Sequence, residues 1–123
     1  MSCTKESIRP VIPSIGPQEN ASDEERFQNE VLRPIIKMQH DIILAYFQSY
    51  IDKMKLQLEG LTGYRKKEIV TNVFGKNQQF KSELRGMIVG QLTLKEFGQY
   101  SKMSVSLNKR INNMLQERVF SSI

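Results

Sequence analysis

The chain has 123 residues, of which 39% are hydrophobic and 25% are charged, and its formal net charge at pH 7 is +5. This length fits one domain with a core of its own, and the average composition excludes a fibrous or low-complexity protein. The lone cysteine, Cys3, excludes an internal disulfide framework and suits a reducing compartment. Because no stretch approaches the roughly 20 apolar residues that a membrane span requires, we expect a soluble protein of the cytoplasm.

Residues 1–21 are rich in residue types that oppose regular structure. They include Pro10, Pro13, Gly16 and Pro17, and closely spaced prolines remove backbone donors and disfavour helix. They also contain charged residues and no apolar run of the length that an export signal needs. We therefore assign residues 1–21 to an extended or disordered N-terminal arm and residues 22–123 to a helical domain.

The stretch from Arg26 to Glu59 predicts the longest helix. Ser22 and Glu25 form a capping-box pattern just before it, and Pro34 predicts a bend or a break because proline has no N–H to donate. Most of its positions are apolar, so we expect this helix at the centre, enclosed by the other helices and by a second copy of the chain. At about 100° per residue its polar side chains fall on one narrow stripe, which comprises Glu30, Lys37, Asp41, Gln48, Asp52, Lys55 and Glu59.

Shorter helices follow in the rest of the chain. Apolar residues at helical spacing predict helices over 64–74 and 78–92, and another that runs to the C-terminus with a break near Met103 and Ser104. Thr93 and Glu96 form a second capping-box pattern at the start of this last helix. No stretch shows the alternation with a period of two that is typical of a strand. The predicted fold class is all-α, roughly a four- to five-helix bundle around a long central helix.

The residue inventory argues against metal or nucleophilic catalysis. His40 is the only histidine and Cys3 the only cysteine, so the ligands of a multi-histidine or thiolate metal site are missing. No glycine-rich phosphate loop follows a predicted strand. We therefore predict no metal, no cofactor and no catalytic residue, and we disfavour an enzyme without excluding one.

Polar residues of the long helix that lie off its polar stripe form the first candidate site. Buried polar groups need partners, and the plainer interpretation is that these side chains pair with carbonyl groups, with the C-terminal helix or with a second copy. The functional interpretation is a small pocket in which Arg33 holds an anion and the others orient it. The residues of this predicted pocket are Asn29, Arg33, Gln39 and His40.

Residues 93–111 have the spacing of a helix-turn-helix and form the second candidate site. Two features weaken this interpretation: Lys102 stands where the turn usually has glycine, and Asn108 stands where the motif usually buries an aliphatic side chain. We therefore keep nucleic-acid binding as an alternative that the sequence does not favour. Its candidate contacts are Asn108, Lys109 and Arg110 in the second helix, with Arg65, Lys66 and Lys67 as a further basic cluster.

Several stretches beyond the arm resemble a family of short, all-helical bacterial proteins whose members are often labelled glyoxalase. These stretches are Ser22–Glu30, Leu32–Lys37, Arg85–Gln91 and Leu107–Arg110. The resemblance implies that the helical domain is a natural unit. It carries over no catalytic residue, because metal-dependent glyoxalases resemble repeats of βαβββ units whose His, Glu or Gln side chains hold the metal, and this chain has no predicted strand and one histidine.

The leading functional prediction follows from the long apolar helix. Its wide apolar arc exceeds what short neighbouring helices readily cover, so we predict a non-enzymatic interaction or structural module that associates with itself as a homodimer. One alternative is a nucleic-acid-binding module that uses the C-terminal helices. The other is a small-ligand binder or an enzyme with a pocket near Arg33 and His40.

Overall fold

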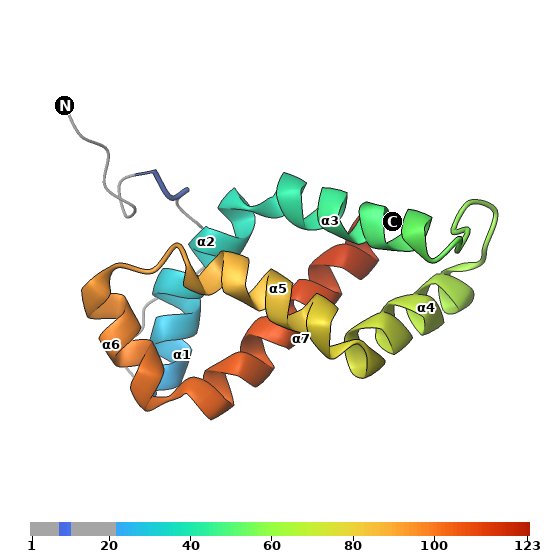
Figure 1. Ribbon diagram of the computed structural model, residues 1–123. Helices are drawn as coiled ribbons and strands as arrows, with labels where there is room; N and C mark the ends of the chain where they lie inside the picture. Colours follow the sequence, from blue (N-terminus) through green and yellow to red (C-terminus); the bar gives the residue numbers. More distant parts are fainter. Residues whose placement is uncertain (1–7, 11–21) are drawn as a thin grey trace.

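Figure 1 shows the computed structural model, which describes residues 8–10 and 22–123; these residues contain helices and no strand, so the all-α prediction is confirmed. Apart from Ile8–Pro10, the predicted arm lies outside the described residues. Within the described ranges no helix is both long and apolar enough to cross a bilayer. The elements are α1 (Asp23–Phe27), the π-helical turn η1 (Gln28–Leu32), α2 (Arg33–Met38), α3 (His40–Lys53), α4 (Gly63–Lys76), α5 (Gln78–Val89), α6 (Leu94–Lys102) and α7 (Ser104–Ser122).

The helix at the centre of the bundle is α7. It contacts η1, α3, α4, α5 and α6, and in Figure 1 it runs from the α6 end of the molecule to the α3 end. Leu107, Ile111, Leu115 and Val119 recur every four residues along it, and all are 0% exposed. We expected residues 26–59 to form the central helix. The C-terminal helix has this place instead, because its aliphatic stripe is long enough to meet all of these neighbours.

The predicted disturbance at Pro34 takes the form of a π-helical turn. Residues 23–38 stay helical, and the N–H of Arg33 donates to the carbonyl of Gln28, five residues back. This wider turn comes directly before Pro34, which has no N–H and would crowd a regular α-helical turn, so the helix continues through the proline. The break comes later, at Gln39, where φ is −91° and ψ is 10°.

α3 ends at Lys53, short of the predicted end at Glu59. Lys55 has a φ of +56°, and the N–H groups of Lys55 and Leu56 donate to the carbonyls of Asp52 and Ile51. These two bonds make a Schellman motif, which usually has glycine at the left-handed position. The predicted end at Glu59 is therefore wrong, because Lys55 takes the left-handed position that a glycine would have marked in the sequence.

The polar stripe lies on the surface as predicted, and all seven of its residues are exposed. The opposite side of α3 is covered within the chain, since Ile43, Phe47 and Ile51 are at most 1% exposed. Ile42, which is 50% exposed, is the large apolar residue of α3 that stays at the surface. One chain therefore covers most of the apolar surface for which we expected a second copy. The cover is partly aromatic: Phe80 of α5 has its ring centroid 5.0–6.2 Å from those of Tyr46, Phe47, Tyr50 and Phe74.

A buried ion pair fastens the described N-terminal residues to α6. Arg9 donates to both carboxylate oxygens of Glu96, at 2.7 and 2.8 Å, and to the carbonyl of Gln91 at 2.6 Å. The side chains of Arg9 and Glu96 are only 7% and 10% exposed. Glu96 also accepts from the N–H of Thr93, which completes the predicted capping box. One carboxylate therefore joins the N-terminal residues, the α5–α6 connection and the first turn of α6.

This arrangement predicts how stability depends on pH. Burial raises the pKa of Glu96, but the hydrogen bonds from Arg9 and Thr93 and the charge of Arg9 outweigh it, so the pKa lies below its ordinary value of 4.5. A carboxyl group with a lowered pKa stabilises the fold above its unfolded-state pKa, and this contribution is lost as the pH falls through the folded-state pKa. Thermal unfolding between about pH 7 and pH 3 should show a smaller loss of stability in Glu96→Gln than in the wild type.

At neutral pH the same substitution should lower the free energy of unfolding by about 1–3 kcal/mol, because it removes one charge from a buried pair. Glutamine still allows the capping hydrogen bond, so the helix start is kept. Glu25→Gln, in the exposed first turn of α1, is the matched control. Identical pH profiles for the wild type and both variants would contradict a stabilising charge on Glu96.

Candidate functional site

The main candidate site is a groove of about 730 Å³ between η1–α2 and α7, which we call the basic groove. Four of its lining residues are cations and one is a carboxylate, so its lining carries a surplus of positive charge. The groove is lined by Gln28, Arg33, Ile36 and Lys37 on one wall and by Arg110, Asn113, Met114, Glu117, Arg118 and Ser121 of α7 on the other.

The α7 wall follows from helical spacing. Arg110, Met114, Glu117 and Ser121 recur at steps of four, three and four, so they share one face of the helix. This face lies roughly a third of a turn from the buried aliphatic stripe of α7. The same helix therefore presents its apolar stripe to the core and a charged face to the groove.

Two arginines lie at the end of the groove that is nearest to η1, which we call the Gln28 end. Arg110 donates to the side-chain oxygen of Gln28 at 2.7 Å. Arg33 donates through Nε to the side-chain oxygen of Asn29 at 2.9 Å. Both guanidinium groups are therefore held next to the first residues of η1, one from each wall.

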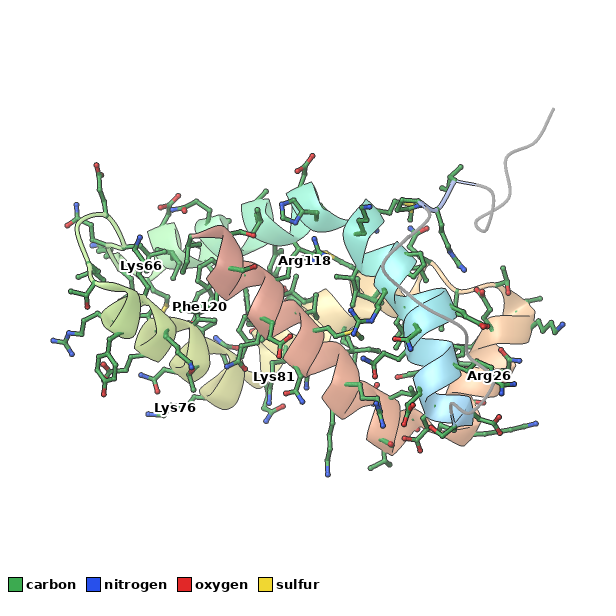
Figure 2. All side chains as sticks on the ribbon, turned by 180° about the vertical axis from the view of Figure 1, so that it is seen from behind. Arg26, Lys66, Lys76, Lys81, Arg118 and Phe120 are labelled. Atoms are coloured by element: carbon green, nitrogen blue, oxygen red, sulfur yellow. The ribbon has the colours of Figure 1, made fainter. Side chains whose placement is uncertain are left out.

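A third arginine lies at the other end, which we call the His40 end. Arg118 and His40 approach at 3.0 Å between a guanidinium nitrogen and Nδ1. Because a guanidinium can only donate, Nδ1 of His40 accepts and the imidazole proton is on Nε2. Lys37 lies one turn before His40 on the same side of the groove. Figure 2, which views the molecule from behind, labels Arg118 on the side of α7 that approaches α3.

The partners of these arginines hold them without cancelling their charge. Asn29, Gln28 and His40 accept as neutral groups. Among the described residues, Arg110 is the one groove cation with a carboxylate within 4.0 Å, since its Nε lies 3.6 Å from Oε2 of Glu24. The guanidinium groups are thus oriented in advance while most of their charge remains available to a ligand.

The structure brings together part of the predicted pocket. Arg33 lines the basic groove, Asn29 orients Arg33, and His40 orients Arg118 at the far end. Gln39 lies at the break between α2 and α3, half-buried and outside the lining of the groove. Three of the four residues therefore lie in or next to the basic groove, whereas Gln39 lies apart from it.

The predicted nucleic-acid contacts lie in different places. Lys66 donates to the carbonyl of Ile123 at 3.2 Å and Lys67 lies over the ring of Phe120, and Figure 2 shows Lys66 and Phe120 near the C-terminal end of α7. Arg110 lines the basic groove, at a distance from this cluster along α7. The remaining contacts are dispersed: Arg65 pairs with Glu68 of its own helix, Asn108 accepts from the hydroxyl of Tyr100, and Lys109 is exposed.

Four charged residues of the groove were not in the predicted pocket, and one of them, Arg110, was predicted instead as a nucleic-acid contact. Lys37 was assigned to the solvent-exposed stripe, and Glu117 and Arg118 were not singled out as site residues. The sequence does indicate the α7 wall, because three polar residues share one helical face beside the aliphatic stripe: Arg110, Glu117 and Ser121. No local pattern, however, indicates that this face lies opposite Arg33.

Comparisons with protein-family models, with curated proteins and with solved structures found no match. Membership of the helical bacterial family that the sequence resembles therefore stays a prediction. In the part of the chain that the structure describes, no group of three or more His, Cys, Asp or Glu side chains is placed to hold a metal ion. The case for a function thus rests on the geometry of the basic groove, which is suited to binding an anion.

Proposed function

We propose that this protein is a binding module for a phosphate- or carboxylate-bearing anion, which it holds in the basic groove. The observation that carries the proposal is that three arginines from two facing helical walls each donate to a neutral acceptor. Of the three, Arg110 also lies beside a carboxylate, that of Glu24. Guanidinium groups form paired, charge-assisted hydrogen bonds with phosphate and carboxylate oxygens. This function corresponds to the pocket near Arg33 and His40 that the sequence analysis put forward as an alternative.

The lining of the groove favours an anion over an apolar ligand or a peptide. Ile36 and Met114 are its apolar members, and the other lining residues are charged or polar. Pockets that bind apolar ligands are lined mostly by hydrophobic and aromatic side chains, and protein interfaces depend on buried aromatic anchors. Neither kind of lining is present here, whereas donor groups are abundant.

The anion should raise the melting temperature of the wild type through Arg33. At a ligand concentration ten times the Kd, binding stabilises the folded state by about 1.4 kcal/mol, which corresponds to several degrees in a domain of this size. Arg33→Ala should abolish most of this rise, and thermal unfolding across a panel of phosphates and carboxylates at constant ionic strength measures it. Without ligand the variant should melt near the wild type, because Arg33 is exposed and its bond to Asn29 lies at the surface.

Arg65→Ala is the matched control. It removes the same side chain and the same charge from α4, outside the groove, where the side chain of Arg65 is 66% exposed. It also removes one of the predicted nucleic-acid contacts. If the wild-type melting temperature is insensitive to the whole panel, or if both variants lose the response equally, the proposed site is wrong.

Glu117 provides a test with the opposite sign. Its carboxylate lines the groove, and among the described residues it forms none of the ion pairs within 4.0 Å. A like charge near the ligand opposes binding, so Glu117→Gln should strengthen anion binding by about two- to fivefold, or roughly 0.4–1 kcal/mol. Isothermal titration calorimetry measures the change. Weaker binding in Glu117→Gln would mean that the carboxylate contacts the ligand favourably, against this arrangement.

Self-association stays a separate proposal, and one feature favours it. Leu94 and Phe97, one turn apart on α6, are 92% and 48% exposed, and adjacent exposed apolar side chains are typical of contact surfaces. A homodimer should give twice the monomer mass in light scattering, and Phe97→Ser should shift the equilibrium toward the monomer. A monomer at every working concentration would remove this proposal and leave the anion site unaffected.

A further inference from the structure

The geometry points to a ligand with several phosphate groups in a chain, which contacts both ends of the basic groove at once. This inference rests on the proposed function and narrows it from an anion in general to a linear polyphosphate. It follows from where the cations lie, because they are divided between two ends of the groove and are not gathered around one point.

At the Gln28 end, each wall of the groove contributes one arginine. Arg110 is held by Gln28 and Arg33 by the adjacent Asn29. Two guanidinium groups offer enough donors to hold one phosphate group from two sides. This end is therefore sufficient for a single orthophosphate.

At the His40 end, Arg118 is held by His40, and Lys37 lies one turn away on the facing wall. Arg110 and Arg118 are eight positions apart on α7, which corresponds to about 12 Å along the helix axis. A hydrogen bond between these donors and a phosphate oxygen spans only about 2.9 Å. A chain of phosphates is therefore better matched to both ends than one phosphate is, and its second contact becomes intramolecular and so adds affinity.

The lining also distinguishes a bare polyphosphate from a single-stranded nucleic acid. Proteins that bind single strands combine a basic groove with aromatic side chains on which the bases stack. None of the lining residues in the described part of the chain has an aromatic ring. The phosphate chain is therefore the recognised group, and bases attached to it have no stacking surface in the groove.

The experiment titrates the full chain with orthophosphate, pyrophosphate and tripolyphosphate at constant ionic strength, using isothermal titration calorimetry. In the wild type, tripolyphosphate should bind at least thirtyfold more tightly than orthophosphate. Arg118→Ala should weaken tripolyphosphate binding about tenfold and orthophosphate binding several-fold less. Arg33→Ala should weaken the binding of both ligands.

Two further variants separate a two-ended site from general electrostatics. Lys37→Ala removes an exposed cation from the His40 end without disturbing the bond between Arg118 and His40, so it should repeat the selective loss if Arg118→Ala perturbs the fold. Lys109→Ala removes an exposed cation next to Arg110 but outside the lining. It should leave the affinity for both phosphates within twofold.

The outcomes separate the proposed anion binding from the narrower inference of a polyphosphate. If orthophosphate binds through Arg33 and tripolyphosphate binds no more tightly, the two-ended ligand is wrong and the proposed function stands. If none of the anions binds, both are wrong. A further titration uses an oligothymidylate with the same number of phosphates as tripolyphosphate. If it binds more tightly than tripolyphosphate, the ligand is a nucleic acid and the polyphosphate inference is wrong. If Lys109→Ala and Arg118→Ala weaken tripolyphosphate binding equally, unspecific electrostatic attraction explains the binding and the two-ended site is wrong.

Discussion

The burial of one face of α7 is the constraint on which the other elements depend. Its four buried aliphatic residues are 0% exposed: Leu107, Ile111, Leu115 and Val119. Burying each of these side chains stabilises the fold by about 1.5–3 kcal/mol. Only neighbours on several sides can cover such a stripe, and η1 and α3 to α6 all contact α7. The groove lies on the face of α7 next to this stripe, so its wall is part of a fully packed helix. Packing of α7 on several sides thus supports the α7 wall of the groove, which is what the proposed binding site would require.

Repulsion between the cations of the groove destabilises the folded protein. Four cations line one groove, and like charges held close together repel each other. Carboxylate partners would relieve the repulsion but would also cancel the attraction for a ligand. Amide and imidazole acceptors orient the guanidinium groups without neutralising them. The carboxylates of Glu24, beside Arg110, and of Glu117, in the lining, offset only part of the positive charge. An anion bound there would relieve this repulsion and form hydrogen bonds at the same time, which supports the proposal of a highly charged ligand.

Local patterns predicted the local structure well. The Thr93 capping box, the exposed polar stripe and the all-α class all follow from spacing within a few residues. The errors arose where distant parts of the chain decide the outcome. Periodicity tells which face of residues 26–59 is apolar, but not that helices of the same chain cover it. In the same way, Arg33 could be singled out as an arginine off the polar stripe, whereas Arg118 acquires its role from His40, 78 positions away.

The π-helical turn explains how Pro34 affects the basic groove. In a regular α-helix, residues five apart point about 140° away from each other. In the π-helical turn, the N–H of Arg33 donates to the carbonyl of Gln28, so residues five apart come closer to the same side of the helix. Gln28 and Arg33 therefore line the same groove, where Gln28 holds Arg110 and Arg33 faces it. Pro34 disfavours a regular turn immediately before it, and the wider turn that results is what places both side chains opposite α7.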